Sequence, residues 1–397
     1  MFPSVGRDNR IVMLALLLWA LGEGLWANLR PIYIEQLGAT PSQVGLVLAI
    51  EGTARVAALI PGGWLSDRYG PRKLIIASWL MGPPAALIVA LAPTWRWVIP
   101  GVALYGASFF VTPALSSYAL MAVPRGIDDG NFERTLTTVL AAYSVGLIFS
   151  QPIGGLIADR YGIRSTYLIS VVVTAASTAV IFKIRNITVP REAASGDWRA
   201  LLRNRPFTIL AAFSFMVMLS LTLGYFLAPN FLYDERGFSL SLIGLFASLF
   251  SIGTVTWNLT LGRLRPRWGI PTLLGMVWLA YLILLQSGAV PVVGFGYLLL
   301  GAQWTARSLM LAAVARRVRP AQRGLAFGIS EVCVWTAMAL SPRIAGTLYE
   351  TRPALPFIAS LVSIPLVAVG SIVLLRVLSR PAAQAAPAVE VSVWRET

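Results

Sequence analysis

Five charged side chains stand within stretches of sequence that are otherwise apolar, and their types could do chemistry there. They are Glu23, Glu51, Arg55, Arg307 and Glu331. A charged group at the centre of a membrane costs roughly 3 kcal/mol or more, so each of these residues is a candidate for a functional role. The chain contains no His, so a bound proton would have to sit on a carboxylate. We predict Glu23, Glu51 and Glu331 as candidate sites at which a proton binds and is released.

The spacing of these residues indicates which of them have a partner. Glu51 and Arg55 are four residues apart on one helix face, which predicts an ion pair that is either structural or opened by a proton or an anion. Glu23 has no partner in its own turn, because Arg30 lies seven residues further along the same face. Glu23 is therefore the better candidate for a carboxyl group that takes up and releases a proton.

The elements that must position these residues are apolar helices. Hydrophobic residues make up 57% of the 397 residues and charged residues 12%, about half the charged fraction of a soluble domain. Stretches close to the roughly 20 residues needed to cross a bilayer recur along the whole chain. We predict an all-α polytopic membrane protein with twelve transmembrane helices, over residues 11–34, 42–65, 73–93, 97–122, 135–158, 165–184, 207–232, 240–262, 271–288, 291–314, 324–348 and 355–378.

Positive charge is distributed unevenly among the connections between these helices. With a cytoplasmic N-terminus, roughly 23 Lys and Arg residues fall in the inner loops and tails and about seven in the outer loops. This bias predicts that both termini are cytoplasmic and that the protein is a multi-pass protein of the plasma (inner) membrane. It also explains most of the formal net charge of +15, so nucleic acid is not an expected partner. The single cysteine, Cys333, excludes an intramolecular disulfide.

One short pattern occurs twice in the chain. Gly63–Gly70 (GWLSDRYG) closes the second predicted helix, and Gly155–Gly162 (GLIADRYG) closes the fifth. Weaker copies close the eighth helix at Gly262–Gly269 and the eleventh at Gly346–Glu350. Successive copies are three helices apart, so they face opposite sides of the membrane. This spacing predicts four three-helix units that are alternately inverted.

The longest inner connection divides the chain into two halves. We predict an N-terminal six-helix bundle at residues 1–184, a cytoplasmic linker at 185–206, a C-terminal six-helix bundle at 207–380 and a disordered cytoplasmic tail at 381–397. The linker is the only charge-dense stretch in the middle of the sequence, and the tail is rich in Ala and Pro. The WRALLRN segment of the linker could form a short helix on the inner leaflet or remain an unstructured tether.

The first copy of the pattern resembles the signature Gly-x-Leu-Ala-Asp-Arg-x-Gly-Arg-Lys of the major facilitator superfamily of secondary transporters. The matching residues are Gly63, Leu65, Asp67, Arg68, Gly70, Arg72 and Lys73, with Ser66 and Pro71 as departures. With twelve predicted helices and a linker after the sixth, the resemblance covers essentially the whole chain. It implies two six-helix bundles, built from 3+3 inverted repeats, around one central cavity.

The resemblance also implies a conformational gate at this signature. In the family, the signature Asp holds the two halves together on the cytoplasmic side in the outward-open state, against the start of helix eleven. Asp67 would then meet the region around Arg323. The expected gate residues are Gly63, Asp67, Arg68, Gly70, Arg72, Lys73 and Arg134. The alternative is a basic loop with a turn that only orients the helices in the membrane.

By the architecture of the family, helices one, four, seven and ten line the cavity, and helices two, five, eight and eleven flank it. The expected cavity residues are Trp26, Asn28, Arg55, Tyr105, Tyr118, Tyr225, Asn230, Gln303, Trp304, Arg307 and Trp335. Further candidates are Ser108, Tyr143, Gln151, Trp257 and Asn258. Arg307 could pair with Glu331 or face the cavity alone. Many rings and few fixed charges suit an amphipathic or aromatic organic solute, although each ring alone could instead pack or face lipid.

Together these features predict a secondary active transporter that moves a small organic solute by alternating access, coupled to protons, with efflux of drugs or other amphipathic solutes as one form. The expected partners are that solute, protons and the lipid bilayer, and a monomer is expected. Alternatives are an organic-anion transporter of the monocarboxylate type, with Arg55 and Arg307 as anchors, and a membrane sensor of the same fold that does not transport. An enzyme is not expected, because a chain without His and with one Cys offers few catalytic groups. No cofactor or metal site is predicted.

The fifth predicted helix departs from the pattern of drug/proton antiporters in the family. Those proteins carry Gly-Pro-x-x-Gly-Gly, whereas this chain has Gln151-Pro152-Ile153-Gly154-Gly155. The difference weakens the antiporter interpretation and leaves the direction of transport open.

Overall fold

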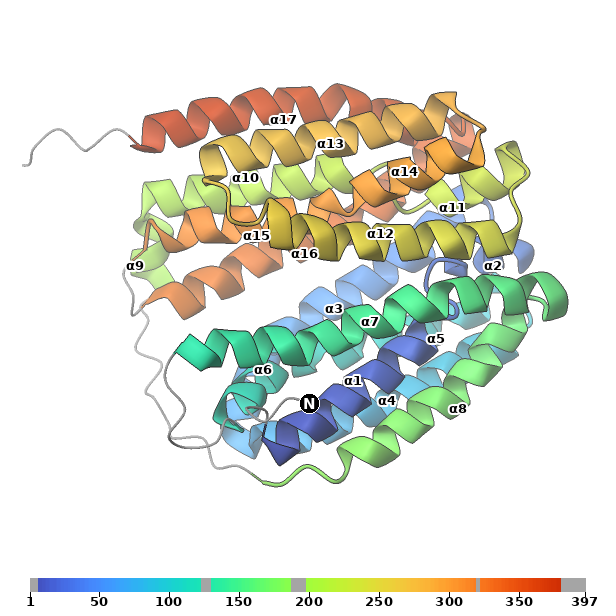
Figure 1. Ribbon diagram of the computed structural model, residues 1–397, viewed down its shortest axis with the longest axis horizontal. Helices are drawn as coiled ribbons and strands as arrows, with labels where there is room; N and C mark the ends of the chain where they lie inside the picture. The colour runs from blue at the N-terminus through green and yellow to red at the C-terminus, as the bar shows by residue number, and fades with distance from the viewer. Residues whose placement is uncertain (1–5, 123–129, 187–197, 319–321, 380–397) are drawn as a thin grey trace, which may run out of the picture.

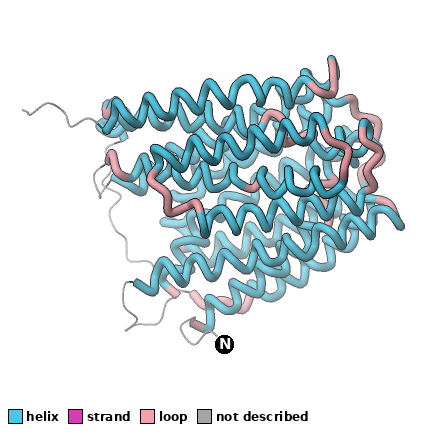
Figure 2. Tube along the Cα trace, turned by 45° about the horizontal axis from the view of Figure 1, so that its top comes forward, coloured by secondary structure: helices cyan, strands magenta, loops and turns pink. Residues whose placement is uncertain are grey.

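Figure 1 shows two bundles of helices that lie side by side along their lengths. The computed structural model describes residues 6–122, 130–186, 198–318 and 322–379, and the regular structure in these ranges is helical (Figure 2). Ten helical stretches within them are long and apolar enough to cross a membrane. The predicted all-α fold is therefore confirmed.

Within residues 6–122 and 130–186, the N-terminal bundle contains six rods built from eight α-helices. They are α1 (Arg7–Gly24), α2 (Arg30–Gln36), α3 (Pro41–Tyr69), α4 (Pro71–Leu91), α5 (Trp95–Ala107), α6 (Val111–Met121), α7 (Gly130–Tyr161) and α8 (Ile163–Ile181). A 3-10 turn, η1 (Ser108–Phe110), joins α5 to α6, and α2 continues the rod that α1 begins.

The C-terminal bundle follows a short helix, α9 (Trp198–Arg203), which forms from the WRALLRN segment of the linker. The helices of this bundle are α10 (Arg205–Thr222), α11 (Ala228–Asn230), the π-helix η2 (Phe231–Glu235), α12 (Leu240–Thr260), α13 (Pro266–Gln286), α14 (Val290–Leu300), α15 (Ala302–Ala315), α16 (Arg323–Thr351) and α17 (Leu355–Ser379). Residues 187–197 of the predicted linker and the predicted tail at 381–397 lie outside the described ranges.

The first helix of every three-helix unit is interrupted, which the sequence analysis did not predict. The breaks fall at residues 25–29, at η1, at residues 223–227 and at Gly301. Pro31 lies at the start of α2 and Pro229 in the short α11, and proline lacks the N–H that would continue a preceding helix. At Gly301, an added Cβ would lie 2.4 Å from a backbone nitrogen of α12, so only a glycine allows that helix to approach so closely.

Both full copies of the repeated pattern end in a tight reversal of the chain. Gly70 and Gly162 adopt φ angles of 83° and 80°, in the left-handed region that favours glycine. Each glycine follows a long helix, α3 or α7, and the next helix begins at the following residue. The repeat therefore fixes two helical hairpins within the N-terminal bundle.

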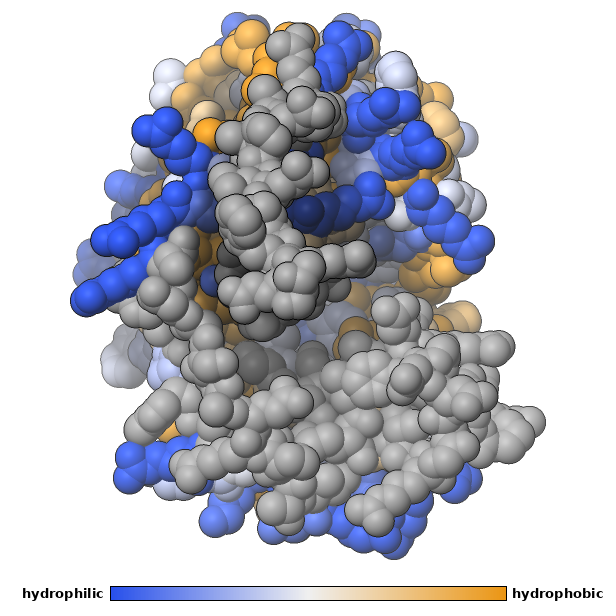
Figure 3. Space-filling model, turned by 90° about the vertical axis from the view of Figure 1, so that its left-hand side faces the viewer, coloured by the Kyte–Doolittle hydropathy of each residue, from blue (hydrophilic) through white to orange (hydrophobic). Residues whose placement is uncertain are grey.

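The surface between the two ends of the molecule is apolar. Leu91, Val172 and Leu366 are 65%, 69% and 70% exposed, as expected for helices that face lipid. Figure 3 looks onto the left-hand end of Figure 1, where hydrophilic side chains gather. This end carries α9 and is the cytoplasmic end in the predicted orientation (Figure 1). We call the opposite end the outer end.

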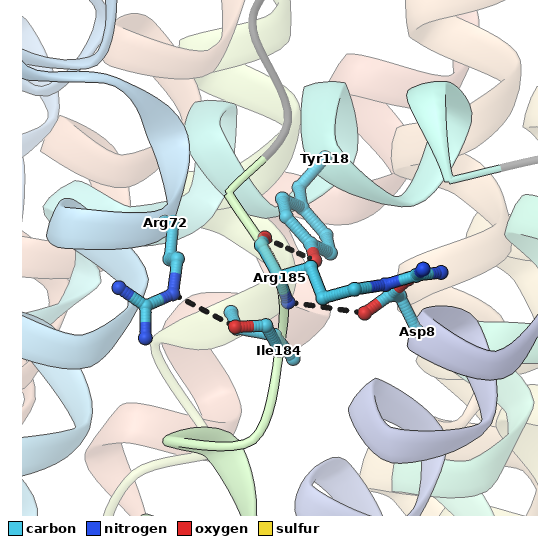
Figure 4. Close-up of polar contacts among 5 residues, drawn as sticks. All are labelled: Asp8, Arg72, Tyr118, Ile184 and Arg185. Carbon is cyan, nitrogen blue, oxygen red and sulfur yellow. Dashed lines mark hydrogen bonds and ion pairs between the residues drawn. The ribbon is translucent and has the colours of Figure 1, made fainter.

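Polar contacts at the cytoplasmic end hold the point where the chain leaves the N-terminal bundle (Figure 4). The carboxylate of Asp8 accepts hydrogen bonds from the backbone N–H of Arg185 at 3.0 Å and from its guanidinium at 2.7 Å. The hydroxyl of Tyr118 donates to the carbonyl of Arg185 at 2.8 Å, and Arg72 donates to the carbonyl of Ile184 at 2.7 Å. The start of the linker is thereby joined to α1, α4 and α6.

Asp8→Asn should loosen this junction. Burial would raise the pKa of the Asp8 carboxyl, but the hydrogen bonds and charge of Arg185 outweigh it and hold the pKa below its usual range. Because the pKa is lowered in the folded protein, the ionised carboxylate stabilises the fold above the ordinary range of Asp, and this contribution is lost as the pH falls through the lowered pKa. Near neutral pH we expect a melting temperature a few degrees below that of the wild type, measured by differential scanning fluorimetry.

The difference between the two proteins should shrink in acid, where the wild-type carboxyl also becomes neutral. Arg10→Ala, at an exposed position of the same helix, serves as the control and should leave the melting temperature unchanged. Equal melting temperatures for Asp8→Asn and the wild type at neutral pH would contradict an anchoring role for Asp8.

Candidate functional site

A cavity of about 470 Å³ lies between the two bundles. Its charged lining residues all come from the N-terminal bundle, and they are Glu23, Arg30, Glu51 and Arg55. The C-terminal bundle contributes uncharged residues to the lining, namely Tyr225, Phe226, Pro229, Phe250, Ser251, Thr254, Trp304, Trp335 and Met338. A wall that carries charge therefore faces a wall that is largely aromatic.

The structure divides the predicted site residues into two groups. Those that line the cavity are Glu23, Trp26, Asn28, Glu51, Arg55, Tyr105, Tyr225, Trp304 and Trp335, with Tyr143 and Gln151 from a flanking helix. Those that lie away from the described lining are Tyr118, Asn230, Gln303, Arg307 and Glu331, with Ser108, Trp257 and Asn258.

Several residues of the second group are committed to other contacts. Tyr118 lies at the cytoplasmic end, where it binds the linker, and Asn230 lies at the outer end, where its amide donates to Glu35. Gln303 is 2% exposed within the C-terminal bundle. Trp257 donates to a backbone carbonyl at 2.7 Å and Asn258 to another at 2.8 Å. Each step along a helix turns a side chain by about 100°, so sharing a cavity helix does not place a residue on its cavity face.

The predicted gate residues lie near the cytoplasmic end. Arg72 holds the start of the linker, and Arg68 and Lys73 are exposed. Arg68 also stacks over the ring of Tyr69, 5.6 Å from its centroid. Gly63, Asp67 and Arg134 belong to α3 and α7, and their further surroundings lie outside what the structure describes. The gate itself stays a prediction.

Glu51 lies between two arginines. Its carboxylate pairs with Arg30 on one side and with Arg55, at 3.1 Å, on the other. Glu51 is 5% exposed, so this group of three charges is largely removed from water. The predicted pair of Glu51 and Arg55 is present. The contact with Arg30 was not predicted, because the prediction assumed a continuous helix with Arg30 on the face of Glu23, whereas the helix is interrupted at residues 25–29.

Arg55 also joins the two bundles through aromatic rings. Its guanidinium lies 3.6 Å from the ring centroid of Phe109 and 4.7 Å from that of Trp335 in α16. The indole N–H of Trp335 donates to Glu331 at 3.0 Å, and Glu331 forms an ion pair with Arg307. Of the two alternatives for Arg307, the structure therefore shows the pair. This chain of contacts connects the charged wall to a second ion pair in the C-terminal bundle.

Glu23 has a different environment from Glu51. Its carboxylate accepts a hydrogen bond of 2.7 Å from the hydroxyl of Tyr143, and it lines the cavity. Among the residues that the structure describes, no Lys or Arg forms an ion pair with Glu23. Glu23 is therefore a carboxylate that faces the cavity without a cation bound to it in the described structure.

Some lining residues were missed by the sequence analysis, and helical spacing could have found several of them. Phe109 follows the predicted Tyr105 by four residues, and Met338 follows Trp335 by three. Residues at these spacings share a helix face. Thr254 likewise precedes Trp257 by three residues and Asn258 by four, although these two candidates do not line the cavity themselves. Phe226, Phe250 and Ser251 carried no comparable signal, because their exposure to the cavity depends on the break in the α10–α11 rod and on the rotation of α12.

The outer halves of the bundles pack against each other along two pairs of helices, α3 with α16 and α7 with α12. An added Cβ on Gly45 would lie 2.2 Å from the carbonyl oxygen of Pro342, and one on Gly52 would lie 2.6 Å from Cα of Ala339. Glycine is required for such backbone contact between helices in a membrane. Arg343 donates to the carbonyl of Ser42 at 3.1 Å across the same seam. The cavity is thus closed toward the outer end, and we call this arrangement outward-closed.

The altered motif of the fifth rod forms the other seam. An added Cβ on Gly155 would lie 2.4 Å from the carbonyl oxygen of Leu240 in the C-terminal bundle. One on Gly154 would lie 2.2 Å from the carbonyl oxygen of Leu25, within the N-terminal bundle. Gln151, which replaces a glycine of the antiporter pattern, accepts a hydrogen bond of 3.1 Å from the hydroxyl of Ser251 in α12. Both side chains line the cavity, so the seam between α7 and α12 begins at the cavity wall.

The described residues provide no cluster of side chains that could bind a metal ion. Within residues 6–122, 130–186, 198–318 and 322–379, the structure contains no group of three His, Cys, Asp or Glu residues that could hold a metal ion.

Comparison with known proteins identifies related transporters. The sequence profile of the major facilitator superfamily matches residues 11–306. The chain is 26% identical over 265 residues to the probable sulfoacetate transporter SauU of Cupriavidus necator, a match that covers 60% of this chain and 59% of that protein. It is 30% identical over 168 residues to the multi-drug resistance efflux pump PmrA of Streptococcus pneumoniae, which covers 41% of each. The chain thus matches between about two fifths and three fifths of the length of these relatives.

A solved structure shows the same fold over nearly the whole chain. The crystal structure of the nucleoside transporter NupG superimposes with a TM-score of 0.75 and covers 94% of this chain and 100% of that one. The two sequences are 15% identical, so this likeness concerns the fold alone.

Proposed function

The chain belongs to the major facilitator superfamily, and on that premise we propose that it is a proton-coupled secondary active transporter of a small amphipathic organic solute, neutral or cationic. The solute would bind in the cavity between the two bundles. Access to that cavity would alternate between the outer and the cytoplasmic side, with the outward-closed arrangement as one of the two states.

The observation that carries this proposal is the environment of Glu23. Arg30 and Arg55 form ion pairs with the carboxylate of Glu51, whereas Glu23 accepts a hydrogen bond from Tyr143 and forms no ion pair with a described Lys or Arg. A carboxylate of this kind in a membrane protein can bind a proton or attract an organic cation, but not both at once. Competition between the two ligands for Glu23 would couple the movement of one to the movement of the other.

The opposite wall supports the amphipathic character of the solute. Trp304, Trp335, Tyr225 and Phe250 come from the C-terminal bundle and present rings to the cavity, and the described lining from that bundle carries no charge. Ring faces suit aromatic and apolar groups, and they also stabilise a nearby organic cation. The multi-drug efflux pump PmrA among the relatives is consistent with a solute of this class.

Glu23→Gln tests the proposal. Glutamine keeps the size of the side chain and a hydrogen bond to Tyr143, but it cannot release a proton. We expect uptake of tetraphenylphosphonium into proteoliposomes, driven by an imposed pH gradient, to fall to the level of empty liposomes. Binding of the same probe, measured by quenching of tryptophan fluorescence, should remain detectable and should no longer depend on pH.

Glu350→Gln is the matched control, because Glu350 is an exposed carboxylate at the outer end of α16. It should keep both gradient-driven uptake and the pH dependence of binding. Full gradient-driven uptake by Glu23→Gln would remove Glu23 from the coupling mechanism.

A second candidate function is favoured by the group around Glu51. Two arginines share one carboxylate there, so this group of three carries a net positive charge, although Glu23 brings the sum of the four charged lining residues to zero. Such a site could hold an organic anion, with Arg55 as the anchor. Arg307 is a weaker anchor than expected, because it pairs with Glu331 away from the described lining. Under this alternative, benzoate rather than tetraphenylphosphonium should bind, and Arg55→Met should abolish its binding.

The membrane location, oligomeric state and orientation of the protein are proposed on the same premise of family membership. The protein is a multi-pass membrane transporter of its family. A monomer in the plasma membrane, with both termini cytoplasmic, completes the proposal. Accumulation of a solute against its gradient in proteoliposomes would separate a transporter from a sensor of the same fold.

A further inference from the structure

Two described carboxylates connect the two bundles at the outer end. Glu35 of α2 accepts a hydrogen bond from the amide of Asn230 in α11, and Asp159 accepts from the backbone of α12. Asp159 lies in the last turn of α7, within the second full copy of the repeated pattern. Its Oδ1 accepts a hydrogen bond of 2.9 Å from the backbone N–H of Leu240, and its Oδ2 accepts one of 2.9 Å from the N–H of Ser241. Leu240 and Ser241 are the first two residues of α12. A side chain of the N-terminal bundle therefore caps a helix of the C-terminal bundle.

The first N–H groups of a helix have no partner within the helix, and they attract negative charge. In α12, the hydroxyl of Ser239 accepts from the N–H of Leu242 at 3.3 Å, so the helix provides a cap for one of these groups itself. The N–H groups of Leu240 and Ser241 receive their described acceptors from Asp159. If the outer ends of the bundles separate, both groups must exchange a carboxylate for water. The contact consequently stabilises the outward-closed arrangement.

The fourth copy of the pattern provides a contrast. Glu350 occupies the position that corresponds to Asp159, at the end of α16, and α16 packs on α3 as α7 packs on α12. At the start of α3, the side chains of Thr40 and Gln43 form a capping box within their own segment. The described structure shows no hydrogen bond from the start of α3 to Glu350. The cap between the bundles is thus a feature of the seam between α7 and α12.

We propose that Asp159 is an outer latch, which holds the transporter in the outward-closed state by capping α12 and must be released before the outer side opens. The two full copies of the repeated pattern then act at opposite ends of the molecule. Asp67 is expected from the family resemblance to act at the cytoplasmic end, and Asp159 acts at the outer end.

Asp159 lies on a seam that extends from the outer end to the cavity, so a change at the cavity can reach the latch. The same seam begins at the cavity wall, where Gln151 of α7 accepts a hydrogen bond from Ser251 of α12. A solute that binds to either of these side chains competes with that bond and loosens the seam below the latch. Asp159 is exposed to water, so its hydrogen bonds can be replaced without a large barrier.

The latch can be tested without any knowledge of the solute or of proton coupling, so its failure is distinct from a failure of the proposed function. The full chain with Cys333→Ser would carry nitroxide labels at Arg96→Cys and Gln286→Cys, two exposed positions at the outer ends of the two bundles. Pulsed electron paramagnetic resonance then measures the distance between the bundles. Loss of a helix cap changes a folding equilibrium constant by about two- to thirtyfold, and we expect a change within this range in the equilibrium between the outward-closed arrangement and one with separated outer ends. We expect Asp159→Ala to raise the ratio of long to short distances about fivefold.

Two further variants make the test decisive. Asp159→Asn offers one acceptor oxygen in place of two and should give a smaller shift, and it is nearly isosteric if the alanine variant does not fold. Ser239→Ala removes the cap that α12 provides for itself, and it should leave the distance distribution unchanged. The proposal would be overturned by identical distance distributions for the labelled protein with Asp159 intact and for both Asp159 variants. It would also be overturned if Ser239→Ala shifted the distribution as much as Asp159→Ala does.

Discussion

We expect Glu51→Ala to lower the free energy of unfolding by about 3 to 5 kcal/mol, the range observed when one partner of a buried ion pair is removed. The substitution leaves Arg30 and Arg55 without their shared carboxylate, and the side chains of both arginines are only 14% exposed. The stacking of Arg55 on Phe109 and Trp335 cannot replace a full negative charge. Thermal and chemical unfolding in detergent would measure the loss.

A double substitution separates the loss of the ion pairs from the loss of packing. Arg55→Met in the background of Glu51→Ala removes one of the two stranded cations, so the combined cost should be smaller than the sum of the single costs. Glu331→Gln is the matched control. Glu331 is 23% exposed and pairs with one arginine, so its replacement should cost less than that of Glu51. A melting temperature of Glu51→Ala equal to that of the wild type would show that the three charges do not stabilise the fold.

Gly45→Val should prevent the outward-closed arrangement. A Cβ at this position would lie 2.2 Å from the carbonyl oxygen of Pro342, and a backbone atom cannot move aside as a flexible side chain can. The seam between α3 and α16 must then part at the outer end. We expect labelling of an introduced Asn28→Cys by a membrane-impermeant maleimide from the outside to rise at least about tenfold, because helix contact at such a seam requires small residues.

Gly275→Val is the control for this experiment. Apart from the backbone of its own helix and its chain neighbours, no atom lies within 4 Å of an added Cβ at Gly275. The larger side chain should therefore be tolerated there, and labelling should remain slow. Under the proposed function, proton-driven uptake should be lost in Gly45→Val, since a transporter that cannot close its outer side cannot complete a cycle. Slow labelling of Asn28→Cys in the Gly45→Val protein would mean that the seam adapts to the added volume.

These two experiments address different parts of the molecule. The charges around Glu51 lie on the cavity wall of the N-terminal bundle, and the glycines of α3 and α16 lie where the two bundles approach most closely. Glu23 belongs to neither group. Loss of coupling in Glu23→Gln without loss of stability would therefore assign stability and coupling to different carboxylates of the same wall.

The sequence by itself determined the fold class and the repeated pattern, and it predicted the two-part organisation. Each of these can be read directly from the sequence, from the length of the apolar stretches, the spacing of the repeated pattern and the charge of the connections. The pair of Glu51 and Arg55 was also predictable, because both residues lie within one turn of a continuous helix. The aromatic character of the cavity followed from the number of rings on the helices that line it.

The tertiary structure alone decided which side chains meet. The break after Gly24 sends Arg30 to Glu51 and leaves Tyr143 as the described partner of Glu23. Tyr118 belongs to a predicted cavity helix, yet it lies at the cytoplasmic end and binds the linker. Contacts of this kind depend on where each helix is interrupted, on its rotation about its own axis and on how deeply it sits against its neighbour. None of these quantities is encoded in a short stretch of sequence, because each is fixed by packing against helices that are distant in the chain.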